Sequence, residues 1–465
     1  MKSKNVFDLD PERLATTDEH GHRVYLFPED VRGAWKARRT VLYWLLILFY
    51  LTLPWIYVGG RPALLIDLGR AELTFFGTTF RGVEPVLLFL FVASGLFFIA
   101  CLTSLYGRVW CGWACPQTVF IQNIFLRLEA LAEGSARKRR ELASGPWTAN
   151  RVLRKALKWF LFTVVSLHIA HTFLGYFVGP RELLRISMGP PSENLTLFIL
   201  TMTATAVILL DFGWFREQFC IIACPYGRMQ SVVMDENSLV ISYDPKRGEP
   251  RRGTPGILRS GEGDCINCFN CVKVCPTGID IRRGTQLECI ACTQCIDACD
   301  EIMAKLNKPP GLIRYSSESE LSGKVRKPLT VRSAVYLATA LLLVGAFAYF
   351  LRSTGDLQLI FLRNKVPFQI TEAGRTVVNQ FTLKLSQQGA RAYSLRFRVR
   401  EGSVRLQTPT TPTSVTGPEK KVVVLFKFPP ELLIGGSRKI LVEVHDDLTD
   451  AVVAEKEVVL VGNTH

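Results

Sequence analysis

Residues 265–299 decide the fold, because two cysteine runs there share one spacing: CINCFNCVKVCP at 265–276 and CIACTQCIDAC at 289–299. Each run reads C-x2-C-x2-C-x3-C, in which three thiolates surround one [4Fe-4S] cluster and the fourth cysteine ligates the other cluster. The spacing therefore predicts two clusters in a ferredoxin-like α+β domain at about residues 260–305. One cluster is assigned to Cys265, Cys268, Cys271 and Cys299, and the other to Cys275, Cys289, Cys292 and Cys295.

Zinc is the main alternative for such cysteines, but a pair of zinc knuckles uses four ligands in two C-x2-C halves. Eight cysteines in duplicated three-plus-one order fit that pattern poorly. The second run departs from the first at Cys299-Asp300, where the first run has Cys275-Pro276. All 13 cysteines lie between Cys101 and Cys299 in tight groups, unlike the scattered disulfide framework of an exported domain. This distribution favours the reducing side of a membrane.

The rest of the chain predicts an α-helical integral membrane bundle. The composition is 48% hydrophobic, and five segments approach the roughly 20 apolar residues that a helix needs to cross the hydrocarbon layer. They are Val41–Val58, Val86–Tyr106, Trp159–Val178, Leu195–Leu210 and Ser333–Leu351. The fourth is short and could continue to Phe215. We therefore expect about five transmembrane helices, four within residues 40–215 and the fifth at 333–351.

Basic residues set the expected orientation. The loop at 127–158 holds nine Lys and Arg residues, whereas 59–84 holds three and 180–194 holds two. The positive-inside bias then places the N-terminal segment 1–39, the loop 127–158 and the segment 216–332 in the cytoplasm. Residues before 41 contain no apolar core, so the first span is read as an uncleaved anchor in a cytoplasmic (inner) membrane. The same bias explains the net charge of +15, and no nucleic-acid partner is predicted.

The last part of the chain, residues 352–465, has the period-2 pattern of β-strands. Apolar and polar residues alternate at 381–386 and 395–400, and further strand-like runs occur at 422–428 and 440–444. Several such runs separated by turns indicate an antiparallel β-sandwich outside the membrane. The segment has no cysteine and no catalytic cluster, so a docking or dimerising module is expected.

Two further cysteine pairs follow membrane spans. Cys111 and Cys115, and again Cys220 and Cys224, form C-x3-C-P motifs at the predicted cytoplasmic exits of the second and fourth spans. On a helix, positions i and i+4 share one face, so each pair would present two sulfurs together, and the following proline tends to end the helix. Soft thiolates suit Cu(I), zinc or iron–sulfur chemistry. Ordinary buried cysteine is the alternative, and Cys101 is interpreted in that way.

His168 and His171 lie within the third span, three residues apart on one helical face. Ionisable groups inside a membrane are costly and suggest a function. They could ligate copper or haem, relay protons, or hydrogen-bond a neighbouring helix, and any further cofactor there is left unidentified. Met202 and Asp211 are weaker candidates.

Taken together, the two C-x3-C-P motifs, the eight cluster cysteines, the last span and the β-domain resemble the CcoG/FixG/RdxA family over nearly the whole chain. The resemblance implies an accessory protein for assembly of cbb3-type cytochrome oxidase. This protein would lie in a bacterial inner membrane and carry an immunoglobulin-like domain in the periplasm. It also implies a cupric reductase, in which Cys111, Cys115, Cys220 and Cys224 bind or reduce copper with electrons from the clusters. Implied partners are membrane lipid, copper ions, copper-delivery proteins and oxidase-assembly proteins, and the β-domain offers a contact for a homodimer.

Two other functions fit the same motifs. A quinol-linked membrane electron-transfer subunit would share the C-x3-C-P and ferredoxin arrangement, although the sequence has no C-x-x-C-H haem site. A non-enzymatic copper chaperone or assembly scaffold would bind copper without turnover. The cytoplasmic electron donor is not identified by any motif.

Overall fold

The computed structural model describes residues 16, 20, 22–58, 60–67, 72–76, 78–81, 85–252, 261–353, 357–364, 368–371, 376–387, 393–415 and 419–462. The chain forms two compact units. The first contains Met1–Ile56 and Phe89–Gly345, and the second contains Tyr57–Leu88 and Ala346–His465.

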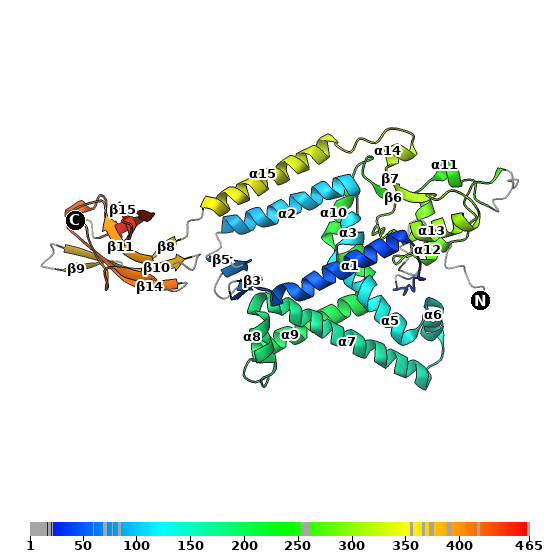
Figure 1. The fold of residues 1–465 in the computed structure, drawn as a ribbon, viewed down its shortest axis with the longest axis horizontal. Coiled ribbons are helices and arrows are strands. Elements are labelled where there is room, and N and C mark those ends of the chain that lie inside the picture. The colour runs from blue at the N-terminus through cyan, green and yellow to red at the C-terminus, as the bar shows by residue number, and fades with distance from the viewer. Residues whose placement is uncertain are drawn as a thin grey trace. The chain divides into compact units, whose positions relative to one another are not determined.

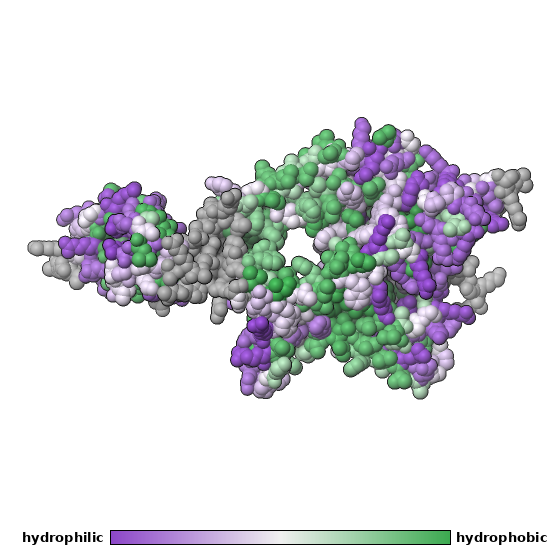
Figure 2. All heavy atoms as spheres, viewed as in Figure 1, coloured by the Kyte–Doolittle hydropathy of each residue, from purple (hydrophilic) through white to green (hydrophobic). Residues whose placement is uncertain are grey.

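Within the described residues, four helices are long and apolar enough to cross a membrane. They are α2 (Pro85–Tyr106), α7 (Ala149–Val178), α9 (Leu195–Ile208) with its π-helical continuation η3 (Leu209–Phe215), and α15 (Val331–Ser353). The predicted second to fifth spans lie within these helices, and the fourth does continue to Phe215. Figure 2 shows apolar side chains gathered over the long helices. Exposing so much apolar surface to water is unfavourable, whereas the hydrocarbon layer of a bilayer accommodates it.

The first span differs from its prediction. Helix α1 covers Ala34–Thr52, so it begins before and ends before the expected Val41–Val58. It ends because Pro54 has no N–H and its ring clashes with the preceding turn of an α-helix. The chain instead forms the 3-10 turn η1 (Leu53–Trp55) and then the short strand β1 (Tyr57–Val58). The predicted bounds of the first span are therefore wrong.

The start of α1 is fixed from another part of the chain. Oδ1 of Asp297 accepts the N–H of Trp35 at 3.2 Å, and its Oδ2 accepts the N–H of Lys36 at 2.8 Å, which satisfies free donors at the helix N-terminus. Helix α1 has only 19 residues, and Lys36, Arg38 and Arg39 leave it a shorter apolar stretch than the other four helices have. By length and composition four helices of the described residues qualify as spans, so the expected count of about five is not confirmed.

Shorter helices connect the long ones. They are α3 (Val109–Trp113), α4 (Pro116–Phe120), η2 (Ile121–Phe125), α5 (Leu126–Glu133), α6 (Ala136–Ser144), α8 (Pro180–Ser187), η4 (Phe219–Ala223) and α10 (Pro225–Val233). An aromatic core joins η2, α7 and η3: the ring of Phe125 lies 4.9 Å from that of Phe162 and 5.4 Å from that of Phe212. This core holds the segment after the first C-x3-C-P motif against α7 and η3.

The cysteine-rich region is framed by two antiparallel strands, β6 (Val240–Tyr243) and β7 (Ile313–Ser316). Between and after them lie α11 (Pro245–Gly248), α12 (Asn270–Lys273), η6 (Ile281–Arg283), α13 (Gln294–Lys305) and α14 (Glu318–Leu321). Ile241, Ile296 and Leu312 are among the residues of its buried core. The mixed helices and strands fit the expected α+β class, and the framing strands extend the region beyond 260–305.

The second unit contains two antiparallel sheets that share one buried core. The first sheet has the order β12-β14-β10-β8, with β9 on β10, and the second has the order β13-β11-β15-β16. Their bounds are β8 (Leu357–Arg363), β9 (Gln369–Thr371), β10 (Thr376–Gln387), β11 (Tyr393–Val399), β12 (Arg405–Gln407), β13 (Thr413–Val415), β14 (Glu419–Phe428), β15 (Ser437–Asp446) and β16 (Val452–Val461), with the turn η7 (Pro430–Leu432). Leu383 and Phe426 of the first sheet and Leu395 and Val442 of the second are fully buried in this core. Two-sheet packing explains the period-2 pattern, because alternate residues face the other sheet.

The second unit also contains small sheets that the sequence did not predict. They lie between α1 and α2 and consist of β1 paired with β2 (Arg61–Pro62), and of β3 (Leu64–Asp67), β4 (Glu72–Phe75) and β5 (Thr78–Arg81) in that order. Figure 1 labels β3 and β5, which follow α1 in the chain. The connection between α1 and α2 thus forms regular β-structure.

Candidate redox site

The structure groups the eight cysteines of the ferredoxin region around two cavities. The cavity that we call the first cluster site is lined by Cys265, Cys268, Cys271 and Cys299. The second cluster site is lined by Cys275, Cys289, Cys292 and Cys295, with Cys271 at its edge. These are the two sets that the crossed three-plus-one assignment predicts. In the described residues no three histidines, cysteines or carboxylates are placed to hold a single metal ion.

The backbone repeats between the two cysteine runs. Asn267 and Phe269 flank Cys268 with positive φ angles of 59° and 58°, and Ala291 and Thr293 flank Cys292 with 54° and 62°. Left-handed residues in such turns direct successive N–H groups into a concavity that binds anions, a feature of many iron–sulfur sites. The duplicated conformation, together with four thiols at each cavity, fits one [4Fe-4S] cluster per site.

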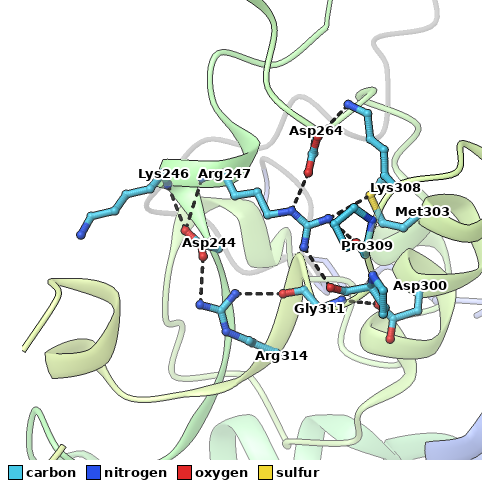
Figure 3. A network of polar contacts seen from close by, with 11 residues as sticks. Asp244, Lys246, Arg247, Asp264, Asp300, Met303, Lys308, Pro309, Gly311 and Arg314 are labelled. Carbon is cyan, nitrogen blue, oxygen red and sulfur yellow. Dashed lines mark hydrogen bonds and ion pairs between the residues drawn. The ribbon is translucent and has the colours of Figure 1, made fainter. Parts of the chain in front are cut away.

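Charges near the first cluster site are paired with opposite charges (Figure 3). Asp264, which precedes Cys265, accepts hydrogen bonds from Lys308 at 2.7 Å and from Arg247. These hydrogen bonds, that from Lys308 first, lower the pKa of the Asp264 carboxyl. Asp300, which follows Cys299, accepts the N–H of Gly311 at 2.7 Å. The network therefore anchors both ends of the chain that supplies this site.

Two buried arginines near the second cluster site have no carboxylate partner among the described residues. Arg39 is 2% exposed and donates to the carbonyl of Cys292, to the carbonyl of Gly112 at 3.1 Å and to Oε1 of Gln122 at 2.7 Å. Arg108 is 7% exposed and donates to the carbonyls of Leu287, of Cys289 at 3.3 Å and of Gly227 at 3.0 Å. Buried charges are costly unless they are compensated. The net negative charge of a cluster with four thiolates would compensate both.

The C-x3-C-P motifs do not have the predicted helical geometry. Cys111 lies in α3 and Cys220 in η4, but Cys115 and Cys224 have extended backbones, with ψ angles of 125° and 114°. The residue before proline is sterically excluded from the helical region, and each proline instead begins the next helix, α4 or α10. The expectation that both cysteines of a pair share one face of a helix is therefore wrong. Each motif is a helix–turn–helix junction with its second cysteine in the turn.

The structure nevertheless brings the two motifs together. Burial raises the pKa of the Cys220 thiol well above its ordinary value, and the nearby thiols of Cys115, Cys111 and Cys224 add to this effect. Burial likewise raises the pKa of Cys111 to about 11, against a hydrogen bond of 3.1 Å from Nε2 of Gln230 to its Sγ. We call these four cysteines the thiol quartet. The raised pKa keeps Cys111 and Cys220 protonated until a metal displaces their protons.

Gly112, the residue after Cys111, contacts the loop of the second cluster site. A Cβ atom at Gly112 would lie 2.2 Å from the carbonyl oxygen of Ala291 and 2.7 Å from that of Ile290, so the two backbones touch. Ile290 and Ala291 lie between Cys289 and Cys292. Helix α3, which carries Cys111, thus packs directly on the loop that would hold the second cluster.

His168 and His171 lie elsewhere. Both line a cavity of about 500 Å³ with Met202, and no cysteine is among its described lining residues. Nε2 of His171 lies 3.0 Å from Oγ of Ser187 in α8. The structure therefore does not join these histidines to the thiol quartet, and His171 contacts the neighbouring helix α8. Asp211 also has a structural contact, since it accepts Nε2 of Gln117 at 2.9 Å.

Three residues of the site were not singled out by the sequence. None of Arg39, Arg108 and Gln230 lies in a recognisable motif. Only Arg108 had an available signal, because it stands three residues before Cys111, at the end of an apolar span. A basic residue at that place is equally expected from the positive-inside bias.

Known proteins resemble most of the chain. Residues 215–318 match the family described as 4Fe-4S dicluster domain, and residues 88–131 match that described as 4Fe-4S binding domain. Protein RdxA of Cereibacter sphaeroides is 36% identical over 415 residues, which cover 83% of this chain and 84% of that protein. Nitrogen fixation protein FixG of Rhizobium meliloti is 36% identical over 323 residues, 64% of this chain and 58% of that protein. A solved structure of a FixG-related protein from Vibrio parahaemolyticus aligns with 24% of this chain and 100% of that chain, at 16% identity and a TM-score of 0.21.

Proposed function

The chain belongs to the CcoG/FixG/RdxA family of iron–sulfur redox proteins, and from this premise we propose that it is a membrane-bound oxidoreductase that reduces Cu(II) to Cu(I). The Cu(I) would serve assembly of a cbb3-type cytochrome c oxidase. When bound, the two [4Fe-4S] clusters supply single electrons, and each Cu(II) ion consumes one.

The contact of Gly112 with Ala291 carries this proposal. It connects the loop of the second cluster site to helix α3, which carries Cys111, by backbone atoms alone. Arg108 reinforces the connection, since it donates to the carbonyl of Cys289 on one side and to that of Gly227, after Cys224, on the other. A short, rigid connection is what electron transfer between two sites requires.

The thiol quartet has the ligand chemistry that suits copper as a substrate, although no three of its cysteines are placed around a single ion in the structure. Soft sulfur ligands favour Cu(I) over Cu(II), so binding there would promote reduction. Gln230 is 0% exposed and donates to the sulfur of Cys111, and a hydrogen bond of this kind stabilises a thiolate once its proton has left.

The test uses the full-length protein, purified without oxygen, with its clusters reduced and excess reductant removed. Cu(II) is added, and cluster reoxidation and Cu(I) formation are followed together. We expect matched electron loss and Cu(I) gain, which the double variants C111S/C115S and C220S/C224S abolish while iron in the ferredoxin region is retained. C101S is the matched control, because Cys101 is a buried cysteine of α2 outside the quartet. Cu(I) formation that persists in both double variants would rule out the quartet, and its absence in the unmodified protein would favour quinol oxidation or a scaffold.

A second occupant of the quartet is supported by one observation. The match to a 4Fe-4S binding domain at residues 88–131 contains Cys111 and Cys115, so the quartet could hold a further iron–sulfur cluster that passes electrons onward. Iron analysis separates the two cases. Two clusters give eight iron atoms per chain, unchanged in C111S/C115S, whereas a third cluster gives more iron that this variant loses.

We further propose that residues 216–332 face the cytoplasm and 352–465 the periplasm of the bacterial inner membrane. The excess of basic residues at 127–158 supports this orientation. The two-sheet second unit would then be the immunoglobulin-like domain of the family, where oxidase-assembly partners or a second copy of the chain bind.

A further inference from the structure

A large cleft lies in the first unit, and no cysteine is among its described lining residues. It has a volume of about 1190 Å³ and is lined by residues 28–33 and by parts of α1, η2, α5 and α6, which Figure 1 labels except for η2. A cleft of this size can hold a ligand the size of a nucleotide or a lipid headgroup. Nothing in the proposed reaction uses it.

The cleft has an excess of positive charge. Six basic residues and two acidic residues line it: Arg32, Lys36, Arg39, Arg127, Arg137 and Arg139 against Glu29 and Asp30. Both acidic residues are already paired, Asp30 with Lys36 and Glu29 with Arg140. Among the described residues Arg32, Arg39 and Arg127 have no carboxylate partner, so the lining would attract an anion.

Buried donors without partners point the same way. Asn123 is 2% exposed, and its Nδ2 has no hydrogen-bond partner among the described residues. Arg139 is 6% exposed; its Nη1 donates to Glu129 at 3.1 Å, while its Nε has no partner there either. Unpaired buried donors cost free energy unless a ligand or water accepts their hydrogen bonds.

Gln122 supplies a third donor whose orientation is determined by its neighbours. Its Oε1 accepts Nη2 of Arg39 at 2.7 Å and Nε2 of Gln294 at 3.1 Å. Since arginine can only donate, the contact with Arg39 assigns the oxygen, and the NH2 group is left without a partner among the described residues. The unpartnered groups of the lining are thus all N–H donors.

From these observations we propose that this cleft binds an anionic, phosphate-bearing ligand. Phosphate oxygens accept hydrogen bonds without donating any, and arginine is the preferred partner for them. The ligand has two sources with the same chemistry, the headgroup of an anionic phospholipid and a soluble phosphate ester. Arg39 connects the cleft to the second cluster site through the carbonyl of Cys292, so the bound anion would lie beside the electron-transfer residues.

The experiment measures binding directly on the full-length holoprotein in detergent and in nanodiscs. Inorganic pyrophosphate, titrated by calorimetry, probes the soluble source. Phosphatidylglycerol, compared with phosphatidylcholine by native mass spectrometry, probes the lipid source. We expect the anionic probe of at least one source to bind, and its affinity to fall with rising salt.

Two variants test whether binding occurs in the cleft. Arg127→Gln removes an exposed, unpaired cation from the lining, and Asn123→Asp replaces an N–H donor by a carboxylate of the same size. Each should weaken binding at least about tenfold, as the loss of a charged hydrogen bond does. Lys138→Gln is the control, since Lys138 is an exposed cation of α6 outside the lining.

The outcomes separate cleanly. Pyrophosphate binding that R127Q weakens and K138Q does not supports a soluble phosphate ester, and selective retention of phosphatidylglycerol with the same variant pattern supports the lipid. Failure of both probes to bind overturns the proposal. Equal effects of R127Q and K138Q also overturn it, because binding would then reflect surface charge alone. Copper reduction is measured separately, so either proposal can fail without the other.

Discussion

Gly112 is the residue on which the electron path depends most directly. A methyl group there would meet the carbonyl oxygen of Ala291 at 2.2 Å, which is far inside van der Waals contact. We expect Gly112→Ala to force helix α3 and the loop at 290–291 apart. The free energy of unfolding should fall by about 1–3 kcal/mol. Because small misplacements of reacting groups slow reactions by up to about 10²-fold, electron loss from the reduced clusters to Cu(II) should slow strongly while iron content is unchanged.

Gly95 offers a matched control for this prediction. It is also a glycine, in α2, and a Cβ there would meet nothing within 4 Å. Stopped-flow reoxidation of reduced protein should therefore give the unmodified rate for Gly95→Ala. A Gly112→Ala protein that is equally fast would show that the backbone contact is not on the path.

Arg39 allows a second prediction at the same scale, which concerns potential and not rate. Reducing a cluster adds a negative charge, which a nearby uncompensated cation stabilises. Arg39→Gln should therefore shift the midpoint potential of one of the two clusters to a more negative value in an EPR-monitored titration. Arg314→Gln, which removes a cation paired with Asp244 at 2.9 Å, should change both potentials less. Equal shifts in the two variants would contradict an electrostatic role specific to Arg39.

These residues also show where sequence reasoning ends. The cysteine spacing predicted both groups of four, because ligand order in such runs is set by the geometry of one cluster. Arg39 and Arg108 could not be assigned, because their partners are backbone carbonyls distant in sequence, at Cys292 and Cys289. The proline after Cys115 and after Cys224 predicts an extended conformation for each cysteine. The prediction instead assumed that the four-residue spacing of each pair lies on a continuous helix.

At the scale of elements, α5, α7 and the end of η3 are joined by a buried ionic cluster around Glu129. This carboxylate is 1% exposed and lies 3.1 Å from Arg139, 3.4 Å from Lys158 and 3.0 Å from Arg216. Burial acts to raise the pKa of Glu129, but the ion pair with Arg216 and the other two cations outweigh it and hold the pKa at about 2. The cluster fixes Arg216, which lies four residues before Cys220.

Glu129→Gln should therefore destabilise the first unit by about 3–5 kcal/mol, because the buried Arg139 and Arg216 lose their carboxylate partner, whereas Lys158 keeps Glu133 at 2.9 Å. The pH dependence follows from the lowered pKa. The stabilisation is fully present above the ordinary value of 4.5 and is lost as the pH falls toward 2. Thermal unfolding of the detergent-solubilised protein should show this acid sensitivity for the unmodified chain and a smaller one for the variant.

The exposed ion pair of Arg137 with Glu141 provides the comparison. Its side chains are 88% and 62% exposed, and such surface pairs contribute little. Glu141→Gln should leave the melting temperature nearly unchanged. If it were as destabilising as Glu129→Gln, burial would not be the source of the effect.

At the scale of the whole molecule, the long helices and the two-sheet core were predictable and the connections between them were not. Runs of apolar residues and period-2 alternation identified the long helices and the two-sheet second unit, because burial pattern sets both signals. The small sheets between α1 and α2 were missed, since strands of two to four residues have too little periodicity. The bounds of α1 were missed because Asp297 fixes its start from more than 250 residues away.

Helix α1 carries the last prediction, because chain connectivity requires a crossing that its composition does not indicate. Its N-terminus is bound to Asp297 of the ferredoxin region. The end of α2 is on the same side, since Arg108 contacts Cys289 of that region. If α2 crosses the membrane, its start at Pro85 is on the opposite side, and the chain from α1 must already have crossed.

Helix α1 is able to make that crossing. Its 19 residues extend about 28 Å at 1.5 Å per residue, close to the thickness of the hydrocarbon layer. Lys36 and Arg39 are bound to the ferredoxin region and need not enter lipid. An epitope inserted after Gly60 should therefore be accessible to antibody from the periplasmic face of intact spheroplasts, like one at the C-terminus, whereas an epitope in the loop at 134–148 should require lysis. Access after Gly60 only on lysis would mean that α1 does not span and that α2 does not cross as its length and composition indicate.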